Sequence, residues 1–300
     1  MDDKLRGPGC GFFGALIVSV RIELCKAKLF PSDQGGMMLQ YWILKKLFPV
    51  SVNKPSKPLV KATQAILDPG SSALPPIDLA KNSKLESHFG KDVWEKIQGK
   101  TVLDFGCGTG AEAVTIALND ARHVTGIDIR QSVLDEARAF AKKCCVERCC
   151  TFTTEISGLF DIIISQDAFE HYENPEAVLG IMKKHLAPQG EIWISFGPPW
   201  FHPRGAHLPS LFPWAHLVFS EKALMRWRAD FKTDGATVFS EVEGGLNKMT
   251  LFRFIRMIKE SGLVEVYRKA VPIRVLARYK SIFPKEFITS VVIEKLKAKC

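Results

Sequence analysis

The chain has 300 residues, of which 46% are hydrophobic and 24% charged, with a formal net charge of +9. This composition is typical of a globular protein and excludes a disordered or low-complexity chain. The lysines and arginines are scattered and no recognition motif accompanies them, so we expect no nucleic acid as a partner. Eight cysteines are too few for a disulfide scaffold of this length, which predicts a reducing, cytoplasmic location.

Residues 1–80 are predicted to form an extension and a linker, because prolines, glycines and serines interrupt them and they lack a clear period. An apolar run at 11–20 is too short to cross a bilayer, and no signal-peptide cleavage site follows it. A buried strand, a buried helix or an interfacial helix fits this run. Peripheral membrane contact through the N-terminal segment is therefore one expectation, whereas the sequence gives no oligomeric state.

From residue 81 to residue 300 the sequence predicts one α/β domain. The segment 85–97 has the period of a helix, and short apolar strands then alternate with helices. The expected elements are strands at 101–105, 123–127, 150–155, 161–165 and 191–196, and helices at 111–119, 131–143 and 175–186. Such alternation indicates a parallel sheet with right-handed crossovers.

The segment 197–247 is too long for an ordinary connection and predicts an inserted lid or substrate-binding segment. Its aromatic and histidine side chains form either a lid over an apolar acceptor or the core of a small subdomain packed against the sheet. They are Trp200, His202, His207, Trp214 and His216. A helix at 249–260 and two strands at 263–267 and 287–293 are expected to complete the domain.

Four cysteines stand in one short stretch, at Cys144, Cys145, Cys149 and Cys150. Adjacent cysteines point in different directions, and the spacing of zinc knuckles is missing. We therefore expect free thiols at a helix end and a strand start, and no metal site.

The strongest functional signal follows the first predicted strand and reads Leu103-Asp104-Phe105-Gly106-Cys107-Gly108-Thr109-Gly110. Its glycines let backbone approach a ligand closely, and Asp128 ends the next strand, where a carboxylate reaches ribose hydroxyls. A dinucleotide needs Gly-x-Gly-x-x-Gly, whereas the spacing here is Gly-x-Gly-x-Gly. Asp104 would also repel a pyrophosphate, and it suits a ligand with an ammonium and a sulfonium, such as S-adenosylmethionine (SAM).

This turn resembles the first motif of the class I SAM-dependent methyltransferases, and the chain is similar to their small-molecule, type 11-like branch. Ile127-Asp128-Ile129 resembles the second acidic motif, residues 160–171 resemble the fourth-strand motif, and residues 186–191 resemble the turn into the fifth strand. The resemblance implies a doubly wound, Rossmann-like sheet of seven strands whose last strand is antiparallel. It also implies SAM as the cofactor and methyl transfer to a small-molecule acceptor.

The same resemblance implies a set of cofactor-binding residues. The glycine turn and Gln166 would hold the methionine part of SAM, Asp128 its ribose, and Ile129 would lie against the adenine. Glu155 would bind the adenine amino group, although only residues 156–160 separate it from the fourth strand, where the family has a longer loop. The full set is Asp104, Gly106, Cys107, Gly108, Gly110, Asp128, Ile129, Glu155 and Gln166.

Methyl transfer from a sulfonium mainly needs positioning, but an oxygen or nitrogen nucleophile can also need a base. The candidate bases are His171, just past the fourth strand, and His202 and His207 in the insertion. Each histidine also has a structural interpretation, as a side chain bonded to a neighbouring loop. A catalytically inactive methyltransferase-fold protein, acting as a binding or membrane-associated module, is the alternative to an enzyme. The intact Asp104 and Asp128 favour the enzyme.

Overall fold

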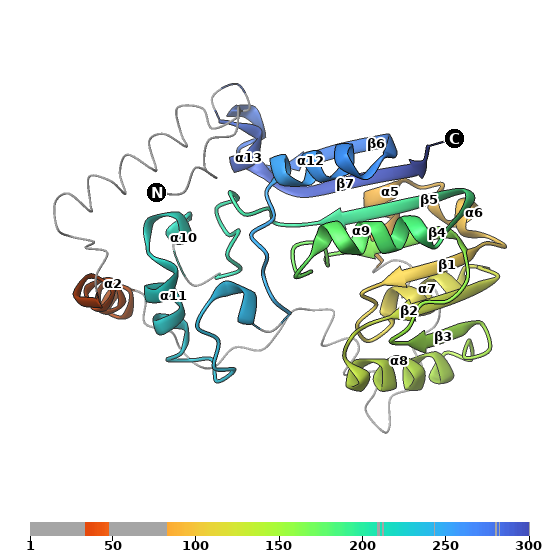
Figure 1. The fold of residues 1–300 in the computed structure, drawn as a ribbon, viewed down its shortest axis with the longest axis horizontal. Coiled ribbons are helices and arrows are strands. Elements are labelled where there is room, and N and C mark those ends of the chain that lie inside the picture. Colours follow the sequence, from red (N-terminus) through yellow and green to blue (C-terminus); the bar gives the residue numbers. More distant parts are fainter. Residues whose placement is uncertain are drawn as a thin grey trace.

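The structure, a computed structural model, describes residues 34–47, 83–208, 211, 213–242, 244–279, 281 and 283–299. The apolar run at 11–20 lies outside these residues. Figure 1 shows a sheet with helices alongside it, and a smaller group of helices, among them α2 and α11, next to one end of the sheet.

The sheet has seven strands in the order β3-β2-β1-β4-β5-β7-β6. Strands β1 to β5 pair in parallel, and β7 runs antiparallel to both of its neighbours. This arrangement confirms the predicted doubly wound α/β fold. The strands are β1 Thr101–Phe105, β2 His123–Ile127, β3 Cys150–Thr153, β4 Phe160–Gln166, β5 Leu186–Phe196, β6 Leu263–Pro272 and β7 Thr289–Ala298.

Each face of the sheet has its own hydrophobic core because successive strand residues point to opposite faces. Val102 belongs to one core and Leu103 to the other. Helices α5 Leu85–Phe89, α6 Val93–Ile97, α7 Ala111–Leu118 and α8 Gln131–Lys143 cover the first face. Helices α9 Pro175–Lys184 and α12 Leu251–Ser261 cover the second. Strand β1 lies between β2 and β4, so the connections diverge there, and open α/β sheets bind ligands at such a point.

Several predicted boundaries are wrong. The single helix expected at 85–97 is two helices, α5 and α6, because the backbone of Gly90 has a φ of +107° and leaves the helical region. Strand β5 begins at Leu186 rather than at residue 191, with an irregular register where the turn was expected. Strand β3 ends at Thr153, before Glu155.

The end of the domain also differs from the prediction. Strand β6 extends to Pro272, five residues beyond its predicted end. The final strand begins at Thr289 rather than 287, because α13, Lys285–Ile288, forms a helical turn before it. Residues 277–279 form a 3-10 turn, η3 Ala277–Tyr279.

The insertion and part of the N-terminal extension form a small helical subdomain. Its elements are α2 Gln34–Leu47, α10 Ala215–Val218, α11 Glu221–Arg228 and the 3-10 turn η2 Phe239–Glu241. Tyr41 and Leu44 of α2 are buried in its core, with Trp227 of α11. The hydroxyl of Tyr41 donates to Asp230 at 3.0 Å. Sequence reasoning missed α2, because its apolar residues lie on both sides of the helix and hide the helical period.

The aromatic residues of the insertion contribute to this packing. Trp200 lies with its ring centroid 4.7 Å from that of His216 and 5.2 Å from that of Phe239. The indole of Trp214 donates to the carbonyl of Phe201 at 2.9 Å. These side chains therefore hold the subdomain together, as the packing interpretation expects. Among the described residues, no helix is both long and apolar enough to cross a membrane.

The attachment of α2 can be tested with a matched pair of substitutions. Leu44→Ala should lower the free energy of unfolding by about 2–5 kcal/mol, because a fully buried leucine leaves a cavity. Leu47→Ala makes the same change in the same helix at a side chain that is 63% exposed, and it should cost about 0.5 kcal/mol or less. Denaturant unfolding measures both values, and equal losses would contradict the observed packing of α2.

Candidate active site

The turn after β1 is built from glycines that no other residue could replace without strain. Gly106, Gly108 and Gly110 have φ values of +81°, +51° and +76°, in the region that favours glycine. A Cβ on Gly110 would lie 2.7 Å from the Cβ of Ala137, and a Cβ on Gly106 would lie 3.1 Å from the hydroxyl of Tyr172. A Cβ on Gly108 would meet no atom within 4 Å. The turn is therefore packed on both sides and open at Gly108.

Asp104 lies beneath this turn and is 5% exposed. Its Oδ2 atom has no hydrogen-bond partner. Burial, together with the neighbouring Glu112 carboxylate, raises the pKa of Asp104 to about 7. Burial also raises the pKa of Glu112. Carboxyl groups at this position favour a cation over a phosphate.

A short segment before α5 lies against these carboxyl groups. The hydroxyl of Ser83 donates to Glu112 Oε2 at 2.7 Å, and the ammonium of Lys84 pairs with Asp167, just past β4. Sequence reasoning missed both Ser83 and Lys84, because they lie well before the motif, in a stretch without a sequence signal of its own. The segment places a protein cation beside the acidic side chains of the turn.

Asp128 connects the end of β2 to the glycine turn. Its carboxylate accepts a hydrogen bond from the N–H of Gly108 at 3.1 Å. It accepts three more from Arg130, from the backbone N–H at 3.0 Å, from Nε at 3.1 Å and from Nη2 at 3.3 Å. Burial opposes ionisation, but the hydrogen bonds from Arg130 and Gly108 outweigh it and lower the pKa of Asp128. Asp128 is therefore an ionised acceptor at the rim of the turn.

The other two predicted nucleoside contacts lie beside Asp128. Ile129 is 95% exposed, which is unusual for isoleucine. Glu155 is exposed just past β3, and its backbone N–H donates to Thr153 Oγ1. Because Ile127 and Thr153 are paired in neighbouring strands, residues 128–129 and 155 follow adjacent strand ends. The structure thus brings Asp128, Ile129 and Glu155 to one edge of the sheet.

Gln166 ends β4, the strand on the other side of β1. Both polar atoms of its side chain, Nε2 and Oε1, are buried without a hydrogen-bond partner. A buried amide that makes no hydrogen bond costs about 1–3 kcal/mol per unsatisfied group, so proteins seldom retain one. The position of Gln166 therefore suits a group that forms hydrogen bonds with a ligand.

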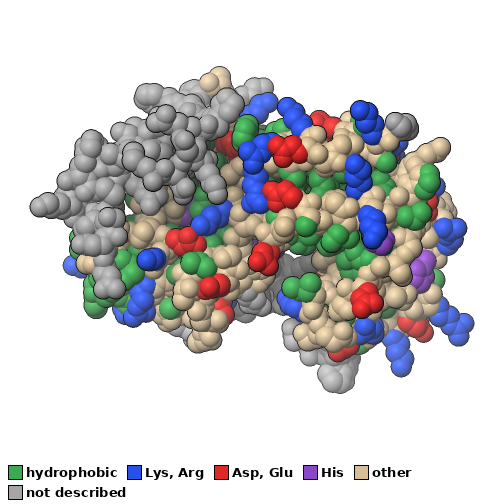
Figure 2. Space-filling view, viewed as in Figure 1, with side chains coloured by type: hydrophobic (Ala, Val, Ile, Leu, Met, Phe, Trp, Pro, Cys, Tyr) green, Lys and Arg blue, Asp and Glu red, His purple; other side chains and the backbone are tan. Residues whose placement is uncertain are grey.

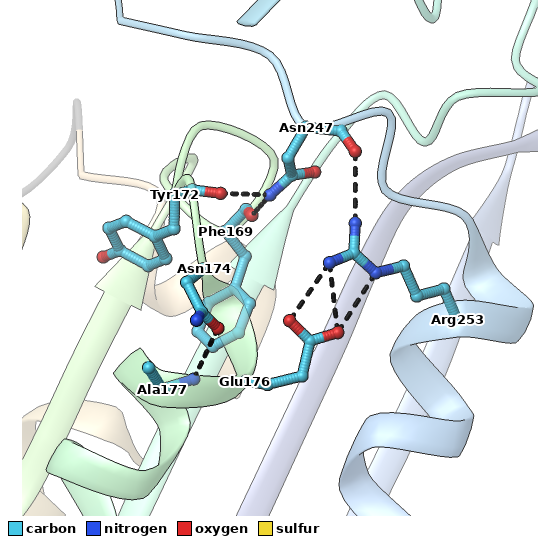
Figure 3. A network of polar contacts seen from close by, with 7 residues as sticks. All are labelled: Phe169, Tyr172, Asn174, Glu176, Ala177, Asn247 and Arg253. Carbon is cyan, nitrogen blue, oxygen red and sulfur yellow. Dashed lines mark hydrogen bonds and ion pairs between the residues drawn. The ribbon is translucent and has the colours of Figure 1, made fainter.

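The loop after β4 is held tightly against β1. The hydroxyl of Tyr172 donates to the carbonyl of Phe105 at 2.9 Å and lies 2.9 Å from Ser165 Oγ. Asn247, from beyond the insertion, donates through Nδ2 to the carbonyls of Phe169 at 2.8 Å and Tyr172 at 2.7 Å (Figure 3). Tyr172 and Asn247 therefore fix the position of residues 169–172 from both sides.

Asn247 is itself held in place by an ion pair between two helices. Its carbonyl accepts from Arg253 Nη1 at 3.2 Å, and the guanidinium of Arg253 pairs with Glu176 of α9 at 3.0 Å (Figure 3). No motif marks Asn247, Arg253 or Glu176, because the contacts join residues more than 70 positions apart. Sequence reasoning missed all three.

Glu170 is a buried carboxyl group in the same loop, 2% exposed. Its Oε1 atom accepts from the N–H of Gly197 at 3.1 Å, and its Oε2 atom has no partner. Burial raises the pKa of Glu170 to about 8. The end of β5 is thereby connected to the loop after β4.

The three predicted histidines do not share one environment. The ring of His171 has its Nδ1 atom 2.6 Å from the carbonyl of Gly245, and its centroid is 5.4 Å from that of His207. A carbonyl can only accept, so Nδ1 of His171 carries the proton and Nε2 has the free lone pair. His202 instead accepts from the N–H of Arg204 through Nδ1, and burial with the nearby Arg204 charge lowers its pKa to about 4. The structure therefore places His171 next to His207, whereas His202 forms its hydrogen bond with the backbone of its own loop.

The cysteines are free thiols in the described part of the chain. Cys107 of the turn packs against the core on the first face of the sheet, and burial raises the pKa of its thiol. The others are Cys144, Cys145, Cys149 and Cys150. No group of three or more histidine, cysteine or acidic side chains is placed to hold a metal ion among the residues described.

Comparison with known proteins identifies the domain. A family model described as a methyltransferase domain matches residues 96–208, which include the glycine turn, Asp128 and the loop after β4. Residues 96–208 therefore match a methyltransferase domain. The predicted family resemblance is thereby confirmed, and the matched residues are those that form the sheet edge described above.

Curated relatives match about a third of this chain. A phosphoethanolamine N-methyltransferase of Triticum aestivum is 35% identical over 109 residues, which cover 35% of this chain and 22% of the relative. A ubiquinone biosynthesis O-methyltransferase of Chromobacterium violaceum is 35% identical over 105 residues, which cover 33% of this chain and 45% of the relative. The chain thus spans less than half the length of each of these relatives.

Solved structures also resemble the chain. Magnesium protoporphyrin IX methyltransferase of Synechocystis PCC 6803, with bound SAH, has a TM-score of 0.48 at 15% identity, covering 87% of this chain and 100% of that one. A S-adenosylmethionine dependent methyltransferase of Mesorhizobium loti has a TM-score of 0.49 at 14% identity, covering 73% of this chain and 100% of that one.

The buried carboxyl of Glu170 predicts a pH-dependent stability. Because its pKa is about 8 when folded and ordinary when unfolded, the folded chain binds more protons between about pH 4.5 and 8. Its contribution to stability is complete below that window and is lost as pH rises through it, by at most about 1.4 kcal/mol per pH unit. Denaturant unfolding at a series of pH values should show a flatter profile for Glu170→Gln.

The control is Glu173→Gln, which changes an exposed glutamate three residues away. Its profile should run parallel to that of the unsubstituted chain. If the Glu170→Gln profile is also parallel, Glu170 is not protonated in the folded protein.

Proposed function

We propose that this protein is a SAM-dependent methyltransferase that acts on a small-molecule acceptor. The observation that carries the proposal is a pair of buried, unsatisfied polar groups at the point where the sheet connections diverge. They are Asp104 Oδ2 at β1 and the amide of Gln166 at β4. They flank the glycine turn of a methyltransferase domain, and a ligand with an ammonium and a carboxylate gives partners to both.

The residues at this edge fit each part of SAM. Asp128 is an ionised acceptor suited to ribose hydroxyls, and the exposed side chain of Ile129 offers an apolar surface to an adenine. Glu155 would accept from the adenine amino group. Asp104 and the turn from Gly106 to Gly110, with Cys107 and Gly108 between them, would hold the methionine end with Gln166. The bound cofactor supplies a methyl group on a sulfonium, a good leaving group.

His171 is the base that the structure favours. The bond from its Nδ1–H to the carbonyl of Gly245 leaves Nε2 ready to accept a proton. The adjacent Tyr172 is bonded to the end of β1, so His171 is held near the glycine turn. The ring of His207 lies against that of His171 and can orient it or the acceptor. His202 has no comparable position, because its Nδ1 already accepts from the backbone.

The acceptor is a small molecule with a nitrogen or oxygen nucleophile. One curated relative is a phosphoethanolamine N-methyltransferase, and another is a ubiquinone biosynthesis O-methyltransferase. Relatives of this chain therefore include both an N- and an O-methyltransferase. A histidine base serves either, because both lose a proton on methylation. We place the enzyme in the cytoplasm, which the free thiols of the described cysteines support.

Cofactor binding is tested by Asp128→Asn. The substitution removes the charge that accepts from ribose hydroxyls, so SAM should bind about 1–3 kcal/mol more weakly by calorimetry. Asp135→Asn makes the same change on α8, at a carboxylate that is 64% exposed, and should leave the affinity unchanged. Equal affinities for the two variants would contradict the assigned pocket.

The role of His171 is tested by His171→Gln. Transfer of labelled methyl to a panel of small amines and phenols should show kcat reduced by about 10²–10⁴-fold, because the base is lost. The affinity for SAM should stay the same. His185→Gln is the control. His185, which follows α9, also bonds a backbone carbonyl through Nδ1, but this is the carbonyl of Gly158 in the loop before β4. A kcat equal to that of the control would rule out His171 as the base.

A further inference from the structure

Helix α2 has a second apolar face that the core of the subdomain does not use. Tyr41 and Leu44 point into that core, whereas Met38, Leu39 and Trp42 are 38%, 42% and 57% exposed. At 100° per residue these three side chains lie within one side of the helix, opposite the buried pair. Such a cluster of large apolar side chains, with a tryptophan at its centre, is unusual for a surface that faces only water.

Cations border this exposed face. Lys45 lies at one edge of the face and Lys46 within it, between Trp42 and Leu39, and Lys45 Nζ is 5.7 Å from the centroid of the Trp42 ring. On neighbouring α11, Lys222 is exposed and Arg226 lies over the ring of Tyr41 at 4.6 Å. Figure 2 shows Lys and Arg side chains next to hydrophobic ones at this end of the molecule.

The acidic side chains next to these cations already form ion pairs. Asp230 pairs with Lys45 at 3.2 Å and with Arg226 at 3.2 Å, and it accepts from the hydroxyl of Tyr41. Glu221 of α11 pairs with Lys248 at 2.7 Å. The edge of the exposed face therefore keeps a net positive charge.

We propose that the exposed face of α2, formed by Met38, Leu39, Trp42 and Lys46, docks on an anionic lipid bilayer. An apolar strip with a tryptophan and with lysines in and beside it is the pattern of a helix that lies in the membrane interface. The apolar side chains enter the boundary of the acyl chains, and the lysines meet anionic headgroups. A protein partner would give less reason for lysines at the edge of the strip and within it, next to further cations on α11.

The fold supports this orientation. The opposite face of α2 is buried against α11, so the helix presents its strip rigidly and needs no rearrangement to bind. The same subdomain includes the insertion that carries His207, beside the proposed base His171. The docking itself does not depend on methyl transfer.

Vesicle flotation of the full chain tests the proposal. The protein should bind vesicles of phosphatidylcholine with phosphatidylglycerol, and bind less to phosphatidylcholine alone. The double variant Leu39→Gln/Trp42→Gln should bind about ten-fold more weakly or worse, because both inserted side chains become polar. Lys46→Glu should weaken binding to the anionic vesicles, and added salt should reduce binding of the unsubstituted chain.

The matched control is Val264→Gln/Val266→Gln, which makes two exposed apolar side chains of β6 polar and should leave vesicle binding unchanged. SAM affinity and the unfolding midpoint of every variant should match those of the unsubstituted chain, which separates docking from folding and from the proposed function. The proposal is overturned if the unsubstituted chain does not bind anionic vesicles, or if Leu39→Gln/Trp42→Gln binds equally well. It is also overturned if that variant only converts a dimer to a monomer in light scattering, which would make the face a contact between two copies.

Discussion

The close contact between the glycine turn and the loop after β4 is the constraint on which the site depends. Tyr172 bonds the last carbonyl of β1, and its hydroxyl occupies space that a side chain on Gly106 would need. This contact fixes the distance between the ends of two neighbouring strands. Asp104, Gln166 and His171 all take their places from those strand ends, so the three roles proposed for them rest on one packing arrangement.

The site concentrates buried polar groups whose hydrogen-bonding capacity the protein does not fill. Asp104 and Gln166 each keep unsatisfied atoms, whereas Asp128 nearby is fully engaged by Gly108 and Arg130. Burying unsatisfied groups costs stability, and a fold selected for stability alone would replace them. Their persistence on both sides of the turn is the physical reason to assign a ligand there. If Asp128 binds a ribose as proposed, Arg130 must yield some of its contact with this carboxylate.

Much of the sheet could be predicted from the sequence because its central strands are continuous apolar runs bounded by turns. The run at Ile162 to Ile164 and the glycine turn identify β4 and the end of β1 without any tertiary information. The rest depends on contacts that have no local signature. Gly90 divides one helical pattern into two helices, and α2 is defined by packing against α11 rather than by period.

The polar contacts of the site divide in the same way, into those that a local motif identifies and those that depend on long-range contacts. Asp128 and Gln166 could be placed from motifs, since strand ends of a parallel sheet meet at one edge. Asn247 could not, because its role exists only once the chain returns to the loop after β4. The pairing of His171 with His207 and the separation of His202 were equally inaccessible, as they depend on the path of the insertion.

The bond between His171 and Gly245 joins residues 74 positions apart and determines which ring nitrogen is basic. Gly244 and Gly245 both have positive φ values, of +84° and +69°, so this backbone carbonyl is aimed by a conformation that few residues adopt. An acceptor that shifts this backbone on entry would release Nδ1 and let the proton move to the other nitrogen. The tautomer of the ring would then report whether the acceptor is bound, and nitrogen chemical shifts of His171 could follow occupancy without any turnover.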